Sequence, residues 1–105
     1  MLKKQYVKSR DIVKVTFELS KTDLPEDIQA ESIQLVGEFN DWDTVATPMP
    51  LKRGDVFRTM VELEPGRAYH FRYLINGEYW CNDSHADTYA AGGAGADNGV
   101  VMTQV

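Results

Sequence analysis

The chain has 105 residues, 43% of them hydrophobic, which fits a single globular domain. Its 16 acidic and 11 basic residues give a formal net charge of −5. This charge argues against a nucleic-acid partner and against an anionic membrane surface, because both are bound through clustered Lys and Arg. A neutral ligand such as a sugar is not opposed by it.

The only cysteine, Cys81, permits no intramolecular disulfide and no zinc site built on several thiolates. Residues 1–8 are basic but precede no apolar run, so they are not typical of a signal peptide. No stretch approaches the length of a transmembrane helix. We therefore expect a cytoplasmic protein, one domain over residues 1–105, that needs no metal or cofactor.

The first half of the chain predicts two strands. Apolar and polar residues alternate over residues 13–19, which indicates a half-buried strand. Residues 20–31 are polar and predict a loop, with one helical turn at residues 26–30. Residues 33–37 continue the strand pattern. From residue 40 to residue 50 the alternation stops, and two prolines there fit poorly in a central strand.

Further strands are predicted in the second half. Alternation returns over residues 57–63 and 69–75, and the Pro65-Gly66 pair between them is typical of a type II turn. Asn76-Gly77 is a strong hairpin signal, with residues 78–81 as the return strand. Residues 86–98 predict a loop and residues 99–105 a last strand.

These segments make about seven short strands with no long helical pattern. The prediction is an all-β protein, an immunoglobulin-like antiparallel β-sandwich. The residues expected between the two sheets are Val15, Phe17, Ile33, Leu35, Phe57, Val61, Tyr69, Phe71 and Tyr73.

Two aromatic positions stand out as candidate binding residues. Trp42 lies where a strand gives way to a polar loop, so its indole either anchors that loop or offers a stacking surface. After the hairpin turn, a two-residue loop would pair Leu74 with Tyr79 and turn Tyr79 outward, whereas a three-residue loop would pair Leu74 with Trp80 and turn Trp80 outward. Either way, one aromatic ring shares the sheet face of Arg72.

This combination suits a sugar. One face of a pyranose is lined with C–H groups and stacks on an aromatic ring, while the hydroxyls at its edge need polar partners. Arg72 offers a fixed fork of N–H donors for such hydroxyls, although a lone arginine on a strand is more often simply solvated. Two rings on a shallow surface would select the curvature of a sugar chain, with modest affinity.

Enzyme interpretations have little support. Cys81 has no evident partner histidine, and a lone buried cysteine is usually inert. Asp41 and Asp43 flank Trp42 in a polar loop with no cleft implied. His85, with Asp83 and Asp87 beside it, is more typical of a loop than of a metal site. We therefore expect a protein that is not an enzyme.

Several linked motifs nevertheless resemble a known family. They are residues 37–42 (GEFNDW), 64–66 (EPG), 69–77 (YHFRYLING), Trp80 with Asn82-Asp83, and 98–101 (NGVV). In this order they resemble carbohydrate-binding module family 48. That family includes the early-set domains of isoamylase and branching enzymes and the glycogen-binding domain of the AMP-activated protein kinase β subunit. The resemblance spans about residues 13–105 and extends to bacterial proteins that carry the domain alone.

The resemblance implies a non-catalytic immunoglobulin-like domain that binds α-1,4-linked glucans such as glycogen or starch. Trp42 and Trp80 correspond to the stacking tryptophans, with Tyr79 as an alternate for the second ring. Arg72 corresponds to the family's basic strand residue, and Asn98 or its neighbour to the sugar-binding asparagine. The alternative is a protein-interaction module with a degenerate sugar site, associated with a glycogen- or starch-metabolising enzyme.

Overall fold

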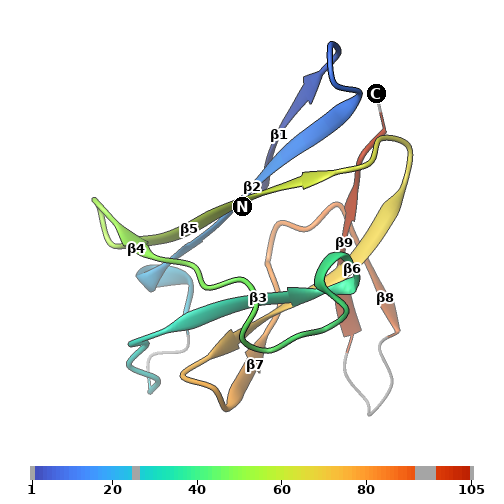
Figure 1. The fold of residues 1–105 in the computed structure, drawn as a ribbon. Helices are drawn as coiled ribbons and strands as arrows, with labels where there is room; N and C mark the ends of the chain where they lie inside the picture. Colours follow the sequence, from blue (N-terminus) through green and yellow to red (C-terminus); the bar gives the residue numbers. More distant parts are fainter. Residues whose placement is uncertain (1, 25–26, 92–96, 105) are drawn as a thin grey trace.

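The computed structural model describes residues 2–24, 27–91 and 97–104 (Figure 1). Within these ranges the chain forms nine strands and two short 3₁₀-helices. The strands make two antiparallel sheets. This confirms the predicted all-β sandwich, with two strands more than the expected seven. No helix in the described ranges is long and apolar enough to cross a membrane.

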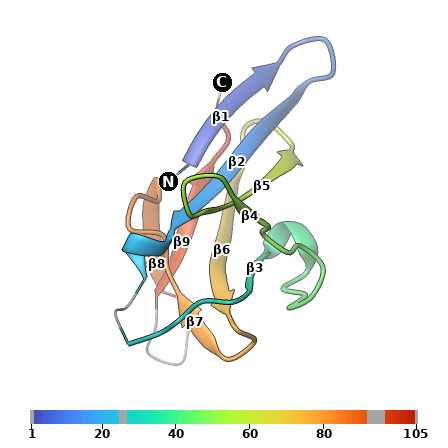
Figure 2. The ribbon, with the colours of Figure 1, turned by 90° about the vertical axis from the view of Figure 1, so that its left-hand side faces the viewer.

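The first sheet has the strand order β1-β2-β5-β4. Its long central strands carry the period-two pattern that the sequence shows. Strands β2 and β5 pair from Val13 opposite Leu63 to Ser20 opposite Val56. The hairpin formed by β1 and β2 extends past the rest of the molecule (Figure 2). The strands are β1 (Leu2–Val7), β2 (Ile12–Ser20), β4 (Leu51–Lys52) and β5 (Val56–Leu63).

The second sheet has the order β3-β6-β9-β8, with β7 also pairing with β6. Strand β6 lies at its centre, since β3 pairs along one side of it and β9 and β7 pair with different parts of it on the other. The strands are β3 (Ile33–Gly37), β6 (Ala68–Ile75), β7 (Tyr79–Cys81), β8 (Thr88–Ala91) and β9 (Asp97–Met102).

The hydrophobic core lies between the sheets. Seven of the nine residues predicted for it are buried, and Val61 and Tyr69 are half-buried against it. Phe71 packs edge-on against both Phe17 and Tyr73, with ring centroids 5.1 and 5.7 Å apart. Edge-to-face packing places the positive edge of one ring on the negative face of another. The core therefore fixes β6, which carries Arg72 on its opposite face.

Two predictions about elements were wrong, and one strand was not predicted. The strand that was not predicted is β1, which pairs with β2 from Leu2 to Val7. The predicted loop over residues 86–98 contains strand β8, and β9 begins at Asp97; residues 92–96 of that loop lie outside the described residues. The helical turn predicted at residues 26–30 is absent from residues 27–30, and residue 26 lies outside the described residues. A 3₁₀ turn, η1, lies earlier, at Lys21–Asp23.

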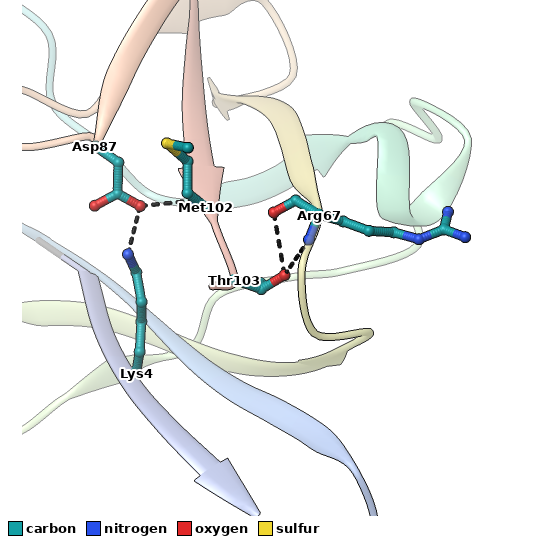
Figure 3. A network of polar contacts seen from close by, with 5 residues as sticks. All are labelled: Lys4, Arg67, Asp87, Met102 and Thr103. Carbon is teal, nitrogen blue, oxygen red and sulfur yellow. Dashed lines mark hydrogen bonds and ion pairs between the residues drawn. The ribbon is translucent and has the colours of Figure 1, made fainter. Parts of the chain in front are cut away.

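Polar contacts tie the two sheets together at one end (Figure 3). Oδ2 of Asp87, just before β8, accepts hydrogen bonds from Lys4 Nζ of β1 at 2.5 Å and from the Met102 backbone N–H at 2.7 Å. Thr103 Oγ1 accepts from the Arg67 N–H at 3.0 Å, which holds the turn between β5 and β6 against the end of β9. The Lys4–Asp87 bond therefore links the edge strand β1, which pairs with β2, to the second sheet.

Candidate functional site

Trp42 is presented by a tight turn at the end of β3. The second 3₁₀-helix, η2 (Glu38–Asn40), follows β3 directly, and Asp41 and Trp42 then both adopt left-handed backbone conformations, with φ of 56° and 58°. The Trp42 N–H donates to the Gly37 carbonyl at 2.9 Å and closes the turn. A bulky residue at positive φ is uncommon, and such strain concentrates at functional sites. The indole is 39% exposed.

Asn40 fixes this turn from within. Its Oδ1 accepts from the Gly37 N–H at 3.0 Å, while its Nδ2 donates to the Leu35 carbonyl at 2.9 Å and to Thr47 Oγ1 at 3.0 Å. A single amide side chain thus satisfies three partners on both sides of the turn. The position of Trp42 is therefore set by the segment itself and does not depend on a ligand.

The second ring is presented by the hairpin of β6 and β7. Leu74 pairs with Trp80 and Ile75 with Tyr79, so the loop has three residues and Glu78 is the extra one. Directly opposed residues share a sheet face. Trp80 therefore lies on the outer face with Arg72, two residues before Leu74, and it is 49% exposed.

Tyr79 points the other way. It pairs with Ile75, a fully buried core residue, and therefore lies on the opposite face of the sheet from Trp80. A hydrogen bond to Glu78 raises the pKa of its phenol. Of the two hairpin aromatics that the sequence left open, Trp80 is the one on the face of Arg72.

Arg72 and Asn98 are joined by a direct hydrogen bond. Arg72 is on the outer face of β6, and its Nε donates to Oδ1 of Asn98 on β9 at 2.6 Å. Asn98 Nδ2 lies 3.2 Å from Nδ1 of His70. Asn98 is only 7% exposed, so its amide is held in place by these neighbours. Gly99 pairs with Phe71 and faces the core, which leaves Asn98 as the asparagine on the outer face.

The predicted residues meet around one hollow. Trp42, Thr44, Arg72, Trp80 and Asn98 line an open depression of about 390 Å³, which we call the aromatic hollow. Its two exposed rings come from different elements, the turn after β3 and the edge strand β7. The guanidinium and the amide lie among its lining residues. Such a surface combines apolar rings with a few hydrogen-bonding groups, as small-molecule sites do.

Asn82 holds the β7 side of the hollow to β9. Its Nδ2 donates to the Asp97 carbonyl at 2.7 Å, and its Oδ1 accepts from the Gly99 N–H at 3.2 Å. Strands β7 and β9 follow one another along the same side of β6, and Asn82 bridges the gap between them. It thereby fixes Trp80 relative to Asn98.

The sequence did not identify two residues at the aromatic hollow, Thr44, which lines it, and His70, which contacts a lining residue. Thr44 lines the aromatic hollow, but a threonine in a polar loop carries no signal of its own. His70 lies two residues before Arg72 on β6, but its contact with Asn98 depends on the pairing of β6 with β9, in which His70 opposes Val100. That long-range register was not predicted.

The rejected catalytic candidates have structural contacts. Asp83 is buried and accepts hydrogen bonds from the Tyr73 hydroxyl and from the His85 N–H, both at 2.7 Å. Asp43 Oδ1 accepts from the Val45 N–H at 2.9 Å. Burial raises the pKa of the Cys81 thiol, which disfavours a reactive thiolate. Over the described part of the chain, no group of three or more His, Cys, Asp or Glu residues is arranged to hold a metal ion.

Comparison with known proteins identifies the family. A search of the curated proteins found no match. The family model described as the glycogen recognition site of AMP-activated protein kinase matches residues 22–104, from within η1 to beyond β9. The match includes all the residues of the aromatic hollow and leaves β1 and β2 outside. The chain belongs to the family of the glycogen recognition site of AMP-activated protein kinase.

Proposed function

We propose that this protein is a non-catalytic module that binds α-1,4-linked glucans such as glycogen or starch. The observation that carries the proposal is the aromatic hollow, in which two exposed indoles, Trp42 and Trp80, share one depression with Arg72 and Asn98. Membership of a glycogen-recognition family supports it independently.

Each part of the hollow has a counterpart in a glucose unit. The C–H face of a pyranose would stack on Trp42 or Trp80, which removes apolar surface from water and matches the negative ring face to C–H dipoles. The Arg72 guanidinium is a hydrogen-bond donor among the lining residues, and it would donate to sugar hydroxyls. Asn98 and Thr44, which also line the hollow, would supply an amide and a hydroxyl.

The shape of the site favours a chain over a single sugar. Two rings held by separate elements would contact different glucose units, so the ligand must follow the surface between them. The hollow is open to solvent, so much of a bound oligosaccharide stays hydrated and the affinity is expected to be modest. Carbohydrate-binding modules are in general non-catalytic, and the half-buried Cys81 thiol, whose pKa is raised by desolvation, adds no nucleophile.

The alternative role, docking of another protein, fits the hollow less well. Protein interfaces place apolar and aromatic residues at the centre and polar residues at the rim. In the aromatic hollow Arg72 and Asn98 lie among the lining residues with the two indoles. Buried beneath a protein partner, these polar groups would each need a matching partner group, whereas a sugar carries hydroxyls around its whole edge.

Co-sedimentation with glycogen and retention on amylose test the proposal. Wild type should be retained, and Trp42→Ala or Trp80→Ala should each weaken binding about 30-fold, the size of a loss of roughly 2 kcal/mol at a central aromatic contact. Tyr6→Ala is the matched control, since it removes a similarly exposed ring (42%) from β1 of the other sheet. If folded wild type fails to bind either polysaccharide, the proposal is wrong and protein partners become the target.

A further inference from the structure

The aromatic hollow rests on a hydrogen-bond chain that runs from Arg72 through Asn98 to His70. Arg72 Nε donates to Asn98 Oδ1 at 2.6 Å, and Asn98 Nδ2 lies 3.2 Å from His70 Nδ1. Asn98 is nine-tenths buried, so its amide cannot reorient freely to solvent. We propose that His70, which lines no part of the hollow itself, is a positioning residue that makes glucan binding depend on the protonation of its imidazole. This inference rests on the glucan-binding function proposed above.

The donor and the acceptor of each hydrogen bond in the series from Arg72 to His70 follow from the groups involved. A guanidinium has donors only, so the atom of Asn98 that faces Arg72 Nε must be the carbonyl oxygen. The Asn98 NH₂ group therefore faces His70 and must donate. His70 Nδ1 must then accept, which requires the neutral imidazole with its proton on Nε2.

A charged imidazole does not fit this arrangement. Both ring nitrogens of a protonated histidine carry hydrogens, so Nδ1–H would face the Asn98 NH₂ group, donor against donor. Flipping the Asn98 amide would relieve that clash but would turn the NH₂ group towards Arg72 Nε, again donor against donor. Protonation of His70 must therefore break one of these hydrogen bonds and disturb the Asn98 amide, which lines the hollow beside Arg72.

Few other charged groups surround His70. Glu38 of η2 accepts a hydrogen bond from the His70 backbone N–H at 2.6 Å, and Arg72 follows two residues later on β6. Strand β3 (Ile33–Gly37) carries no titratable residue. On β9 the titratable residue is Asp97, one position before Asn98 and so on the other face of the sheet. Strand β8 (Thr88–Ala91) has only Tyr89, which pairs with the core-facing Gly99.

The proposal predicts that glucan affinity falls as the pH falls. Glucans carry no group that titrates near neutral pH, so a change in affinity there must come from the protein. Histidine is the side chain that changes charge between about pH 5 and pH 8. Binding should therefore be strongest at the upper end of this range, where His70 is neutral, and should weaken as the pH falls and the imidazole becomes charged.

The two histidines of the protein allow a matched pair of variants, His70→Asn and His85→Asn. His85 is the only other histidine and lies outside the hollow. Maltoheptaose binding would be measured by calorimetry between about pH 8 and pH 5.5, above the range in which ordinary carboxylates titrate. Wild type and His85→Asn should each lose affinity about fivefold on acidification, the effect of one hydrogen bond. His70→Asn keeps an uncharged acceptor near the position of Nδ1 and should show little pH dependence. An equal loss in His70→Asn, or a flat profile in wild type, would overturn the proposal.

A second measurement on free wild type separates this inference from the binding function. The NMR signals of the Arg72 Nε–H and the Asn98 side-chain amide should titrate with the midpoint of the His70 ring. Signals that stay unchanged while His70 titrates would overturn the positioning role whether or not glucan binds. Signals that follow His70 in a protein that binds no glucan would support the hydrogen-bond chain and reject the binding function.

Discussion

At the scale of single residues, the segment from Gly37 to Trp42 shows how a short motif sets a binding side chain. Gly37 has an extended backbone, so its role is one of space: a Cβ there would lie 2.7 Å from the His70 carbonyl oxygen and 2.9 Å from the Phe39 ring. Phe39 packs against Phe17 of the core at 5.7 Å between ring centroids. The close approach of Gly37 to β6 is thus what lets the turn carry Trp42 over the sheet.

Gly37→Ala should therefore lower both stability and binding. Overpacking at this contact should cost about 1–3 kcal/mol of unfolding free energy and displace the turn that holds Trp42. Urea unfolding and maltoheptaose titration would measure the two effects. Gly54→Ala is the control: it strains a residue at φ 86° with no neighbour within 4 Å of the added Cβ, and should leave the affinity of the folded protein unchanged. Normal affinity in Gly37→Ala would contradict this account.

Tyr73 carries a second prediction at this scale. Its hydroxyl donates to the buried Asp83 carboxylate at 2.7 Å, and burial, then Asp83, raises the pKa of Tyr73 well above its usual value near 10. Tyr73→Phe removes one donor from a buried carboxylate and should cost about 1–3 kcal/mol at pH 7.

The same pKa shift predicts a loss of stability in alkali. Because unfolded Tyr73 ionises above pH ~10 while the folded residue stays protonated, this contribution is complete below that pH and is lost as the pH rises through the folded-state pKa. Urea unfolding between pH 7 and pH 11 should show a shallower decline in Tyr73→Phe than in wild type. Equal slopes in the two proteins would contradict the assignment.

At the scale of elements, alternation predicted the strands that bury one face, β2, β5 and β6, and failed at the edges. Strand β1 has adjacent lysines, and its register puts Lys4 opposite Val15, on the core-facing side, where it reaches out to Asp87. A contact between residues so far apart in sequence leaves no local pattern. Strand β8 is short and mostly exposed, so its apolar content did not alternate.

The register of the hairpin of β6 and β7 could likewise not be predicted from the local sequence. Asn76-Gly77 correctly predicted the turn, and both residues have positive φ, 53° and 74°. The register depends on Glu78, whose N–H bonds the Ile75 carbonyl at 3.0 Å while Tyr79 pairs with Ile75. That extra residue decides whether Tyr79 or Trp80 faces the hollow, and turn residues alone do not specify it.

Asn76 also ties this hairpin to the loop before β3. Its Oδ1 accepts from the N–H groups of Glu31 and Ser32, and its Nδ2 donates to the Gln29 carbonyl at 2.9 Å. Asn76→Ala should lose all three bonds and place alanine at positive φ, for a total cost of about 2–3 kcal/mol. Asn76→Asp keeps the acceptor and should cost less, as chemical denaturation would show. Equal stability of Asn76→Ala and wild type would refute the role of this contact.

At the scale of the whole molecule, the sandwich brings distant segments to one face. Trp42 follows β3, Trp80 lies on β7 and Asn98 on β9, and all three adjoin Arg72 on the central strand β6. Strand pattern and family motifs together predicted these four residues. Thr44 and the link from Asn98 to His70 depend on loop conformation and on pairing across β9, so they required the folded structure.

The net charge of −5 leads to a prediction for the molecule as a whole. A glucan is neutral, so its binding releases no counterions and gains nothing from long-range attraction. Raising the salt concentration from about 50 to 500 mM should change maltoheptaose affinity less than twofold, although it shortens the screening length severalfold. Calorimetry at the two salt concentrations would measure this. A tenfold or larger loss in high salt would indicate a charged ligand in place of a neutral sugar.

The most direct test of the central claim compares two adjacent residues of one hairpin. Trp80 and Tyr79 are almost equally exposed, 49% and 46%, but lie on opposite faces of the sheet. Calorimetric titration with maltoheptaose should show affinity reduced about 30-fold in Trp80→Ala and unchanged in Tyr79→Ala. Equal loss in both variants, or loss in Tyr79→Ala alone, would contradict the account of the aromatic hollow as the glucan site.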